Sequence, residues 1–243
     1  MKILSIGNSF SEDAQRYLAA VGHSLGLEIK CVNACIGGCT LVRHYNNIRS
    51  GARDYLVQEC GTNVREGATL REIILSDSFD VITLQEASVR SVDYHNFEPY
   101  LSELVKYIRD LCPDAKIALH ETWGYESESE RIKNLGYTAH EDMYASIKEA
   151  YAKAMSESGA DFLIPSGRVM AMLYGEGLKI HRDGFHASRG VGRYALALTW
   201  VRAICGVSVE DNDFYDFEEE ITDEERRAVI SAVESIYKNT EVN

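Results

Sequence analysis

Short apolar runs alternate along this chain with longer stretches in which apolar residues recur at helical spacing. The apolar runs, each bounded by turn-forming residues, cover 2–7, 29–35, 80–85, 116–121 and 161–165. The stretches with a three- or four-residue period cover 12–25, 40–49, 69–76, 97–111, 138–158, 188–205 and 222–238. Strands that alternate with helices are typical of βαβ units. We therefore expect an α/β fold: a three-layer αβα sandwich around a five-stranded, mostly parallel sheet.

Local signals mark where two of these helices begin. Thr138 with Glu141, and Thr222 with Glu225, have the spacing of a capping box, in which a hydroxyl and a carboxylate satisfy the first free amides of a helix. Both pairs predict a helix start.

Two polar segments do not fit the alternation, namely 52–68 and 124–137. They follow the second and fourth predicted strands, and loops at the carboxyl ends of strands surround the ligand crevice of open α/β sheets. We expect both to form the rim or lid of that crevice. No linker or repeat divides the chain, so residues 1–243 are interpreted as a single domain with these two insertions.

The charge balance excludes some partners. The chain has 38 acidic and 25 basic residues, a formal charge of -13, and no cluster of Lys and Arg. Nucleic acid is therefore a poor partner, and no apolar stretch is long enough to cross a bilayer. Met1 runs directly into a strand-like segment without a signal-peptide pattern, which favours a cytoplasmic location.

The six cysteines indicate neither a disulfide framework nor a zinc site. A disulfide-stapled domain is usually much shorter, and the C-x-x-C pairs of zinc sites are absent from the sequence. We expect buried free thiols and no metal.

Polar residues gather just after the predicted strands. Ser9 follows the first strand, Gly38 the second, Gln85 the third, and "DGFH" with Asp183 and His186 follows the last. Because the carboxyl ends of parallel strands meet at one edge of a sheet, these residues should converge.

This set contains the parts of a nucleophilic site. A serine hydroxyl needs a base to take its proton, and that base needs a third group to fix its tautomer. Asp183 and His186 are three residues apart, so the carboxylate can reach the imidazole and leave its other nitrogen for Ser9. The Ser9 and Gly38 amides and the Gln85 side chain are candidate oxyanion donors. Ser9 with Glu12 also has the spacing of a capping box, so helix capping is the alternative role for Ser9.

Three ordered motifs resemble those of the SGNH hydrolases, the GDSL-type esterases and lipases. "GNSFS" (7–11) is similar to their first block, "NACIGGCT" (33–40) to their second, and "DGFH" (183–186) to their last. The resemblance implies a flavodoxin-like fold, Ser9 as nucleophile, Gly38 as an oxyanion amide, and His186 and Asp183 as base and orienting acid. It implies no cofactor.

The chain departs from the family pattern at two places. Asn8 stands where the first block usually has aspartate, which should alter local hydrogen bonds. The third block, usually Gly-x-Asn-Asp, is replaced by "LQEAS", so the oxyanion role of its asparagine is assigned to Gln85. Carbohydrate acetylesterases, which have Gln-Gly-Glu there, are more similar, and a bacterial branch with Gly-Asn-Ser-Phe is the most similar.

The resemblance predicts a small-molecule ester substrate, such as an acetylated carbohydrate. Trp123, Tyr125 and Glu86 follow strands and are candidate substrate-binding residues, because aromatic faces can stack on a sugar ring. A lipase or thioesterase of the same superfamily and a non-catalytic binder of carbohydrates or anions are the alternatives. The sequence does not define the oligomeric state.

Overall fold

The computed structural model describes residues 1–238, and within them the chain builds one seven-stranded sheet. The strands are β1 (Lys2–Gly7), β2 (Lys30–Cys35), β3 (Tyr55–Glu59), β4 (Thr62–Ala68), β5 (Val81–Leu84), β6 (Lys116–His120) and β7 (Phe162–Ile164). Their order across the sheet is β4-β3-β2-β1-β5-β6-β7. The strands β2, β1, β5, β6 and β7 run parallel to one another. They are the five strands that the sequence predicts.

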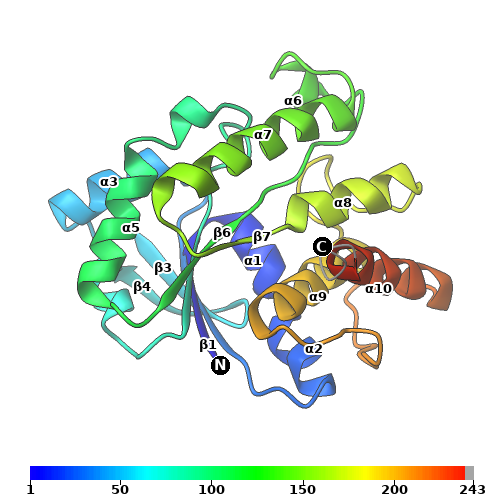
Figure 1. Cartoon of the computed structure of the whole chain (residues 1–243), viewed down its shortest axis with the longest axis horizontal. Coiled ribbons are helices and arrows are strands. Elements are labelled where there is room, and N and C mark those ends of the chain that lie inside the picture. The colour runs from blue at the N-terminus through cyan, green and yellow to red at the C-terminus, as the bar shows by residue number, and fades with distance from the viewer. Residues whose placement is uncertain (239–243) are drawn as a thin grey trace.

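Helices cover both faces of the sheet. They are α1 (Ser9–Gln15), α2 (Leu18–Ser24), α3 (Leu41–Ser50), α4 (Leu70–Ile74), α5 (Tyr100–Leu111), α6 (Glu130–Lys133), α7 (His140–Ser158), α8 (Ser166–Gly175), α9 (Val191–Cys205) and α10 (Asp223–Lys238), with a 3₁₀ turn at Tyr94–Asn96. In Figure 1, α3 and α5 lie on one side, and α1, α2, α9 and α10 lie on the other. The α/β sandwich is therefore as predicted.

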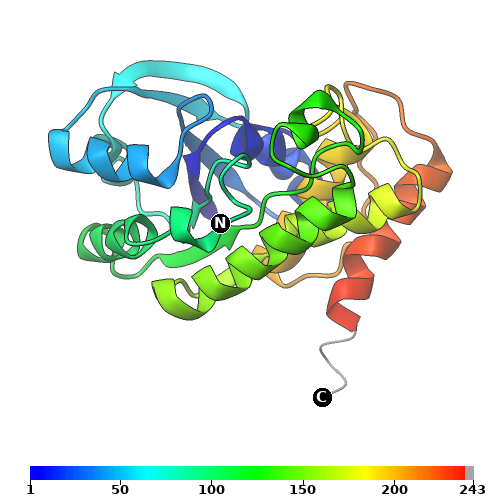
Figure 2. The same ribbon diagram turned by 90° about the horizontal axis from the view of Figure 1, so that it is seen from above.

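The segment 52–68 corrects one expectation. It forms the β3–β4 hairpin, which adds two antiparallel strands beside β2 instead of a rim or lid, and so gives seven strands rather than five. Figure 2 shows this hairpin, in cyan, along the sheet edge. The turn places Cys60 and Gly61 at positive φ, +48° and +77°, and charged residues in β4 keep the outer edge solvated.

The central strands are apolar on both sides because helices cover both of their faces. Ile3, Leu4 and Ile6 of β1 are fully buried, as are Ile82 and Leu84 of β5. The buried centre of the sheet fixes where β1 ends, and therefore where Ser9 lies.

One of the two predicted capping boxes forms. The Thr222 hydroxyl accepts from the Glu225 amide at 3.1 Å, and the Glu225 carboxylate accepts from the Thr222 amide at 2.7 Å. The Thr138 box does not form, because α7 starts later, at His140, whose amide donates to the Ser127 hydroxyl instead.

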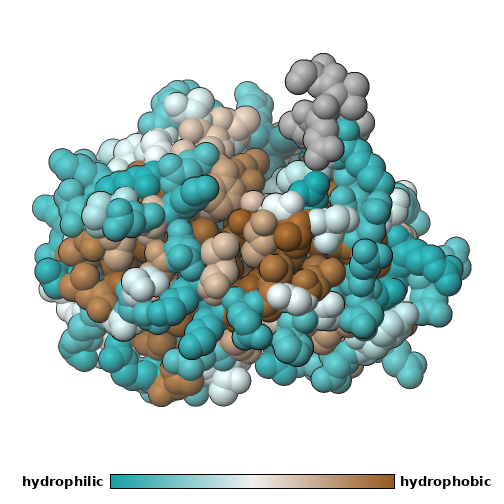
Figure 3. Space-filling view, turned by 60° about the horizontal axis from the view of Figure 1, so that its bottom comes forward, coloured by the Kyte–Doolittle hydropathy of each residue, from teal (hydrophilic) through white to brown (hydrophobic). Residues whose placement is uncertain are grey.

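The outer surface combines charged and apolar areas. Figure 3 shows apolar residues gathered in the middle of one face with hydrophilic residues around them. Some exposed apolar surface is normal for a folded protein. Among the described residues, no helix is both long and apolar enough to span a membrane.

Candidate active site

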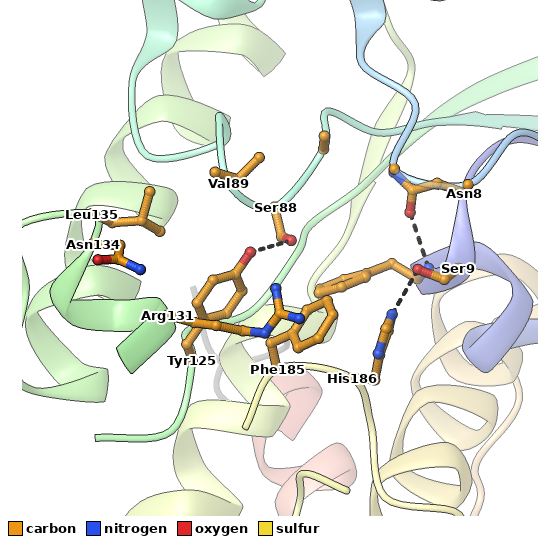
Figure 4. A pocket seen from close by; sticks show the side chains of 14 residues that line it. Asn8, Ser9, Ser88, Val89, Tyr125, Arg131, Asn134, Leu135, Phe185 and His186 are labelled. Atoms are coloured by element: carbon orange, nitrogen blue, oxygen red, sulfur yellow. Dashed lines mark hydrogen bonds between the residues drawn. The ribbon is translucent and has the colours of Figure 1, made fainter. Parts of the chain in front are cut away.

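A pocket of about 600 Å³ opens at the carboxyl ends of β1, β2 and β5. This edge is where open α/β sheets bind ligands, and the volume suits a small molecule. The lining residues are Asn8, Ser9, Phe10, Gly37, Gly38, Ala87, Ser88, Val89, Tyr125, Arg131, Asn134, Leu135, Phe185 and His186. The sequence thus brings together residues from six separate segments at one hollow (Figure 4).

Ser9 is not the residue that caps α1. Asn8 occupies the N-cap, where its side-chain oxygen accepts from the Phe10 amide at 3.0 Å and its amide nitrogen donates to the Cys39 carbonyl at 3.0 Å. The predicted partner Glu12 accepts instead from Gln58 at 3.1 Å. The Ser9 hydroxyl is therefore free of capping and points into the pocket.

Ser9, His186 and Asp183 form a continuous hydrogen-bonded chain. The Ser9 Oγ lies 2.9 Å from His186 Nε2 (Figure 4). His186 Nδ1 lies 2.7 Å from an Asp183 oxygen. The His186 amide also donates to Asp183, at 2.9 Å. Burial alone raises the pKa of Asp183, but these hydrogen bonds outweigh it and hold that pKa below its usual range. An ionised Asp183 keeps the proton on Nδ1 and leaves Nε2 to accept from the serine.

Buried ion pairs fasten the loop that carries His186. Asp13 of α1 accepts two bonds from Arg182, at 2.8 and 2.9 Å, and one from Arg193, at 2.9 Å. The Trp123 indole donates to the Phe185 carbonyl at 2.8 Å. Since Arg182 directly precedes Asp183, these contacts fix the imidazole relative to the helix that begins at Ser9.

Two residues that line the same hollow carry backbone amides beside the Ser9 hydroxyl, namely Ser9 and Gly38. Ser9 opens α1, and Gly38 lies in the turn after β2 with φ +61°, a conformation that favours glycine. Over residues 1–238, no protein acceptor is recorded for either N–H. Both amides are therefore available to an oxygen that develops negative charge beside Ser9.

Gln85 and Glu86 lie beneath the pocket and do not line it. The Gln85 amide nitrogen donates to Asn8 Oδ1 at 2.9 Å, and its oxygen is 2.9 Å from His120 Nδ1. Glu86 is fully buried and accepts from the Leu41 and Ala87 amides. These contacts differ from the predicted oxyanion role of Gln85 and the predicted substrate contact of Glu86, because both side chains are used in holding the neighbouring loops together.

The two predicted aromatic residues have different positions. Trp123 is fully buried and stacks under Phe10, with ring centroids 4.0 Å apart, so it supports the pocket and does not face it. Tyr125 does line the pocket, and its hydroxyl is 2.8 Å from that of Ser88.

The second polar insertion forms one wall of the pocket. Residues 124–137 contain α6 and supply Arg131, Asn134 and Leu135 to the lining. This agrees with the expectation that the segment forms part of the rim. Sequence reasoning missed these individual residues, together with Ser88 and Phe185. Phe185 lies inside "DGFH", so the motif that points to His186 could also have pointed to Phe185. No sequence motif marks the other missed residues.

No group of three or more His, Cys, Asp or Glu side chains within residues 1–238 is placed to hold an ion.

The fold is the α/β fold of the SGNH hydrolases, as the motifs predict. A protein from Slackia heliotrinireducens assigned to those hydrolases is 22% identical, with a TM-score of 0.62 over 84% of this chain and 98% of that one. A family 3 carbohydrate esterase from Clostridium thermocellum is 15% identical, with a TM-score of 0.54 over 85% of this chain and 96% of that one.

The chain belongs to the DUF4886 family, whose model, described as a domain of unknown function, matches residues 2–233. A DUF4886 family protein from Bacteroides uniformis is 32% identical, with a TM-score of 0.90 over 98% of this chain and 95% of that one. A comparison with curated proteins found no match.

Proposed function

We propose that this protein is a serine ester hydrolase that removes a small O-acyl group, such as acetyl, from a carbohydrate or related small molecule. The observation that carries the proposal is the chain from the Ser9 hydroxyl through His186 to Asp183, at the wall of an open pocket. A hydroxyl aligned in this way is activated as a nucleophile.

Ser9 Oγ attacks the acyl carbon while His186 Nε2 takes its proton. The carbonyl oxygen becomes an oxyanion, which accepts hydrogen bonds from the Ser9 and Gly38 amides. His186 then donates the proton to the leaving alcohol, and an acyl-enzyme remains on Ser9. Water, deprotonated by the same imidazole, attacks the acyl-enzyme and releases the acid.

Asp183 acts through His186. Its bond to Nδ1 orients the ring and stabilises the imidazolium that forms in each step, and its bond from the His186 amide holds the backbone beside it. Gln85 is a positioning residue in this scheme, because it donates to the Asn8 side chain that caps α1.

The lining of the pocket supports a polar small-molecule substrate. Tyr125 provides an aromatic ring, and Ser88 and Asn134 provide hydrogen-bonding groups. The fold likeness to a carbohydrate esterase agrees with an acylated sugar.

A fluorophosphonate probe and p-nitrophenyl acetate test the proposal. The native protein should label at Ser9 and hydrolyse the ester, whereas Ser9→Ala and His186→Ala should do neither. Asp183→Asn should label slowly and lower kcat by about 10³- to 10⁴-fold. A folded native protein that neither labels nor hydrolyses would refute the enzyme and favour a binding protein.

A further inference from the structure

We propose that Arg131 selects esters that carry a carboxylate near the scissile bond. This inference deepens the proposed hydrolase function and rests on it, since the arginine lies in the pocket that holds Ser9.

The guanidinium of Arg131 is placed over the pocket by an aromatic ring. Its central carbon is 3.9 Å from the centroid of Phe185, and the Phe185 ring lies 3.7 Å from the His186 ring, centroid to centroid. Figure 4 shows the arginine reaching across Phe185 toward the side of the pocket that holds His186. Stacking leaves the N–H edges of a guanidinium open to a ligand.

The segment that carries Arg131 is fastened to the fold. The Ser129 hydroxyl accepts from the Ile132 amide at 3.3 Å, and the Ile132 side chain is fully buried. The Glu126 amide donates to the Gly184 carbonyl at 2.8 Å, which ties this segment to the loop of His186. These contacts therefore hold the backbone that carries Arg131 in place beside the pocket.

The charge of Arg131 is not neutralised by the protein. The nearby acids Glu128 and Glu130 pair with Lys133, at 3.2 and 4.0 Å, and no ion pair is recorded for Arg131 in the described chain. None of the fourteen lining residues is acidic. In a chain with a net charge of -13, this arginine is what makes the pocket receptive to an anion.

The chemistry favours a carboxylate. A guanidinium and a carboxylate form two parallel hydrogen bonds, and one cation balances one negative charge. Asn134, which follows the same short helix, also lines the pocket. The carboxylate can belong to the acyl group or to the alcohol, and the experiment separates the two.

Two matched ester pairs test the inference. For the acyl side, mono-p-nitrophenyl glutarate is compared with p-nitrophenyl valerate; for the alcohol side, para-acetoxybenzoate is compared with para-acetoxybenzamide. In at least one pair, kcat/KM should be higher for the carboxylate. Arg131→Gln should lower that value by about 10- to 100-fold, and the neutral ester should lose much less. Lys106→Gln is the control, because it removes an exposed positive charge of α5 that lies outside the lining, and it should leave both esters unchanged.

A readout without turnover separates this inference from the hydrolase proposal. Glutarate and para-hydroxybenzoate are titrated calorimetrically into Ser9→Ala and into Ser9→Ala/Arg131→Gln. Binding of either compound that is lost with Arg131 supports the anion site even if no ester is hydrolysed. If neither compound binds, or if Arg131→Gln weakens neutral and anionic esters by the same factor, Arg131 only covers Phe185 and the inference is wrong.

Discussion

The N-cap of α1 allows a sharp prediction, because Asn8 stands where the SGNH pattern usually has aspartate. Asn8 is 2% exposed, and its side-chain amide acts both as a hydrogen-bond acceptor and as a donor. Its oxygen accepts from the Phe10 amide and from Gln85, whereas its nitrogen donates to the Cys39 carbonyl. Asn8→Asp keeps the acceptor and replaces the donor by a second, charged acceptor.

Two effects of this substitution oppose each other. A carboxylate at the start of a helix gains about 0.3–1 kcal/mol from the helix dipole. Loss of the donor leaves the buried Cys39 carbonyl unsatisfied, which costs about 1–3 kcal/mol, and places two oxygens side by side. The cost is larger, so Asn8→Asp should lower the free energy of unfolding by about 1–2 kcal/mol at neutral pH.

The pH dependence follows from the same contact. A protonated carboxyl can again donate to Cys39, so folding raises the pKa of this new group by about one unit above its unfolded value near 3.9. The deficit relative to the native protein should therefore be absent below about pH 4 and grow as pH rises through 5.

Urea unfolding at pH 4 and pH 7.5 measures this deficit. Asn46→Asp, on the exposed side of α3, is the control for the added charge and should stay within about 0.5 kcal/mol of the native protein. If Asn8→Asp is as stable as the native protein at pH 7.5, the bond to Cys39 is not what requires asparagine.

Three further predictions test other parts of the fold. Burial raises the pKa of Glu86 to about 7, although its two backbone donors act in the opposite direction. Ionisation of Glu86 therefore lowers the stability of the native protein as pH rises from 4.5 to 7. In urea unfolding, the free energy of unfolding of Glu86→Gln relative to the native protein should rise by about 3 kcal/mol between pH 4 and pH 8. The Cys31 thiol, 3.2 Å away, donates to Cys60 and holds the pKa of the Cys60 thiol below its usual range. Iodoacetamide at pH 7 should therefore alkylate Cys60 first, as read by peptide mass spectrometry, and more slowly in Cys31→Ala; equal labelling of all thiols would contradict this. Thr222→Ala removes the capping box of α10 and should lower the unfolding free energy by about 1 kcal/mol, and no change in a thermal melt would show that the cap is dispensable.

The parallel strands and most helices were predictable because their signals are local. A buried strand of a parallel sheet is a continuous apolar run, and β1 and β5 have such runs. The hairpin at 52–68 was not predictable in the same way, because its strands lie at the sheet edge and β4 is almost entirely exposed. An edge strand with polar residues has the same pattern as a loop.

The site was predictable as a set and not in its detail. Ser9, Asp183 and His186 were chosen from motifs, and the fold brings them within hydrogen-bonding distance of one another. Gln85 and Trp123 follow strands as expected, yet both point into the interior, since the residue number along a strand does not specify which face a side chain takes after the strand ends.

The sequence by itself determined the order of the elements, the residue types available for chemistry and the acidic character of the chain. The tertiary structure alone decided that the Asn8 side chain bonds to Cys39 and Gln85, that Asp13 fastens the loop of His186, and that Arg131 stands over Phe185. The physical reason is distance along the chain. Helix and strand periodicity arises from neighbouring residues, whereas these contacts join side chains separated by tens of residues or more, and only the packed sheet and its loops bring them together.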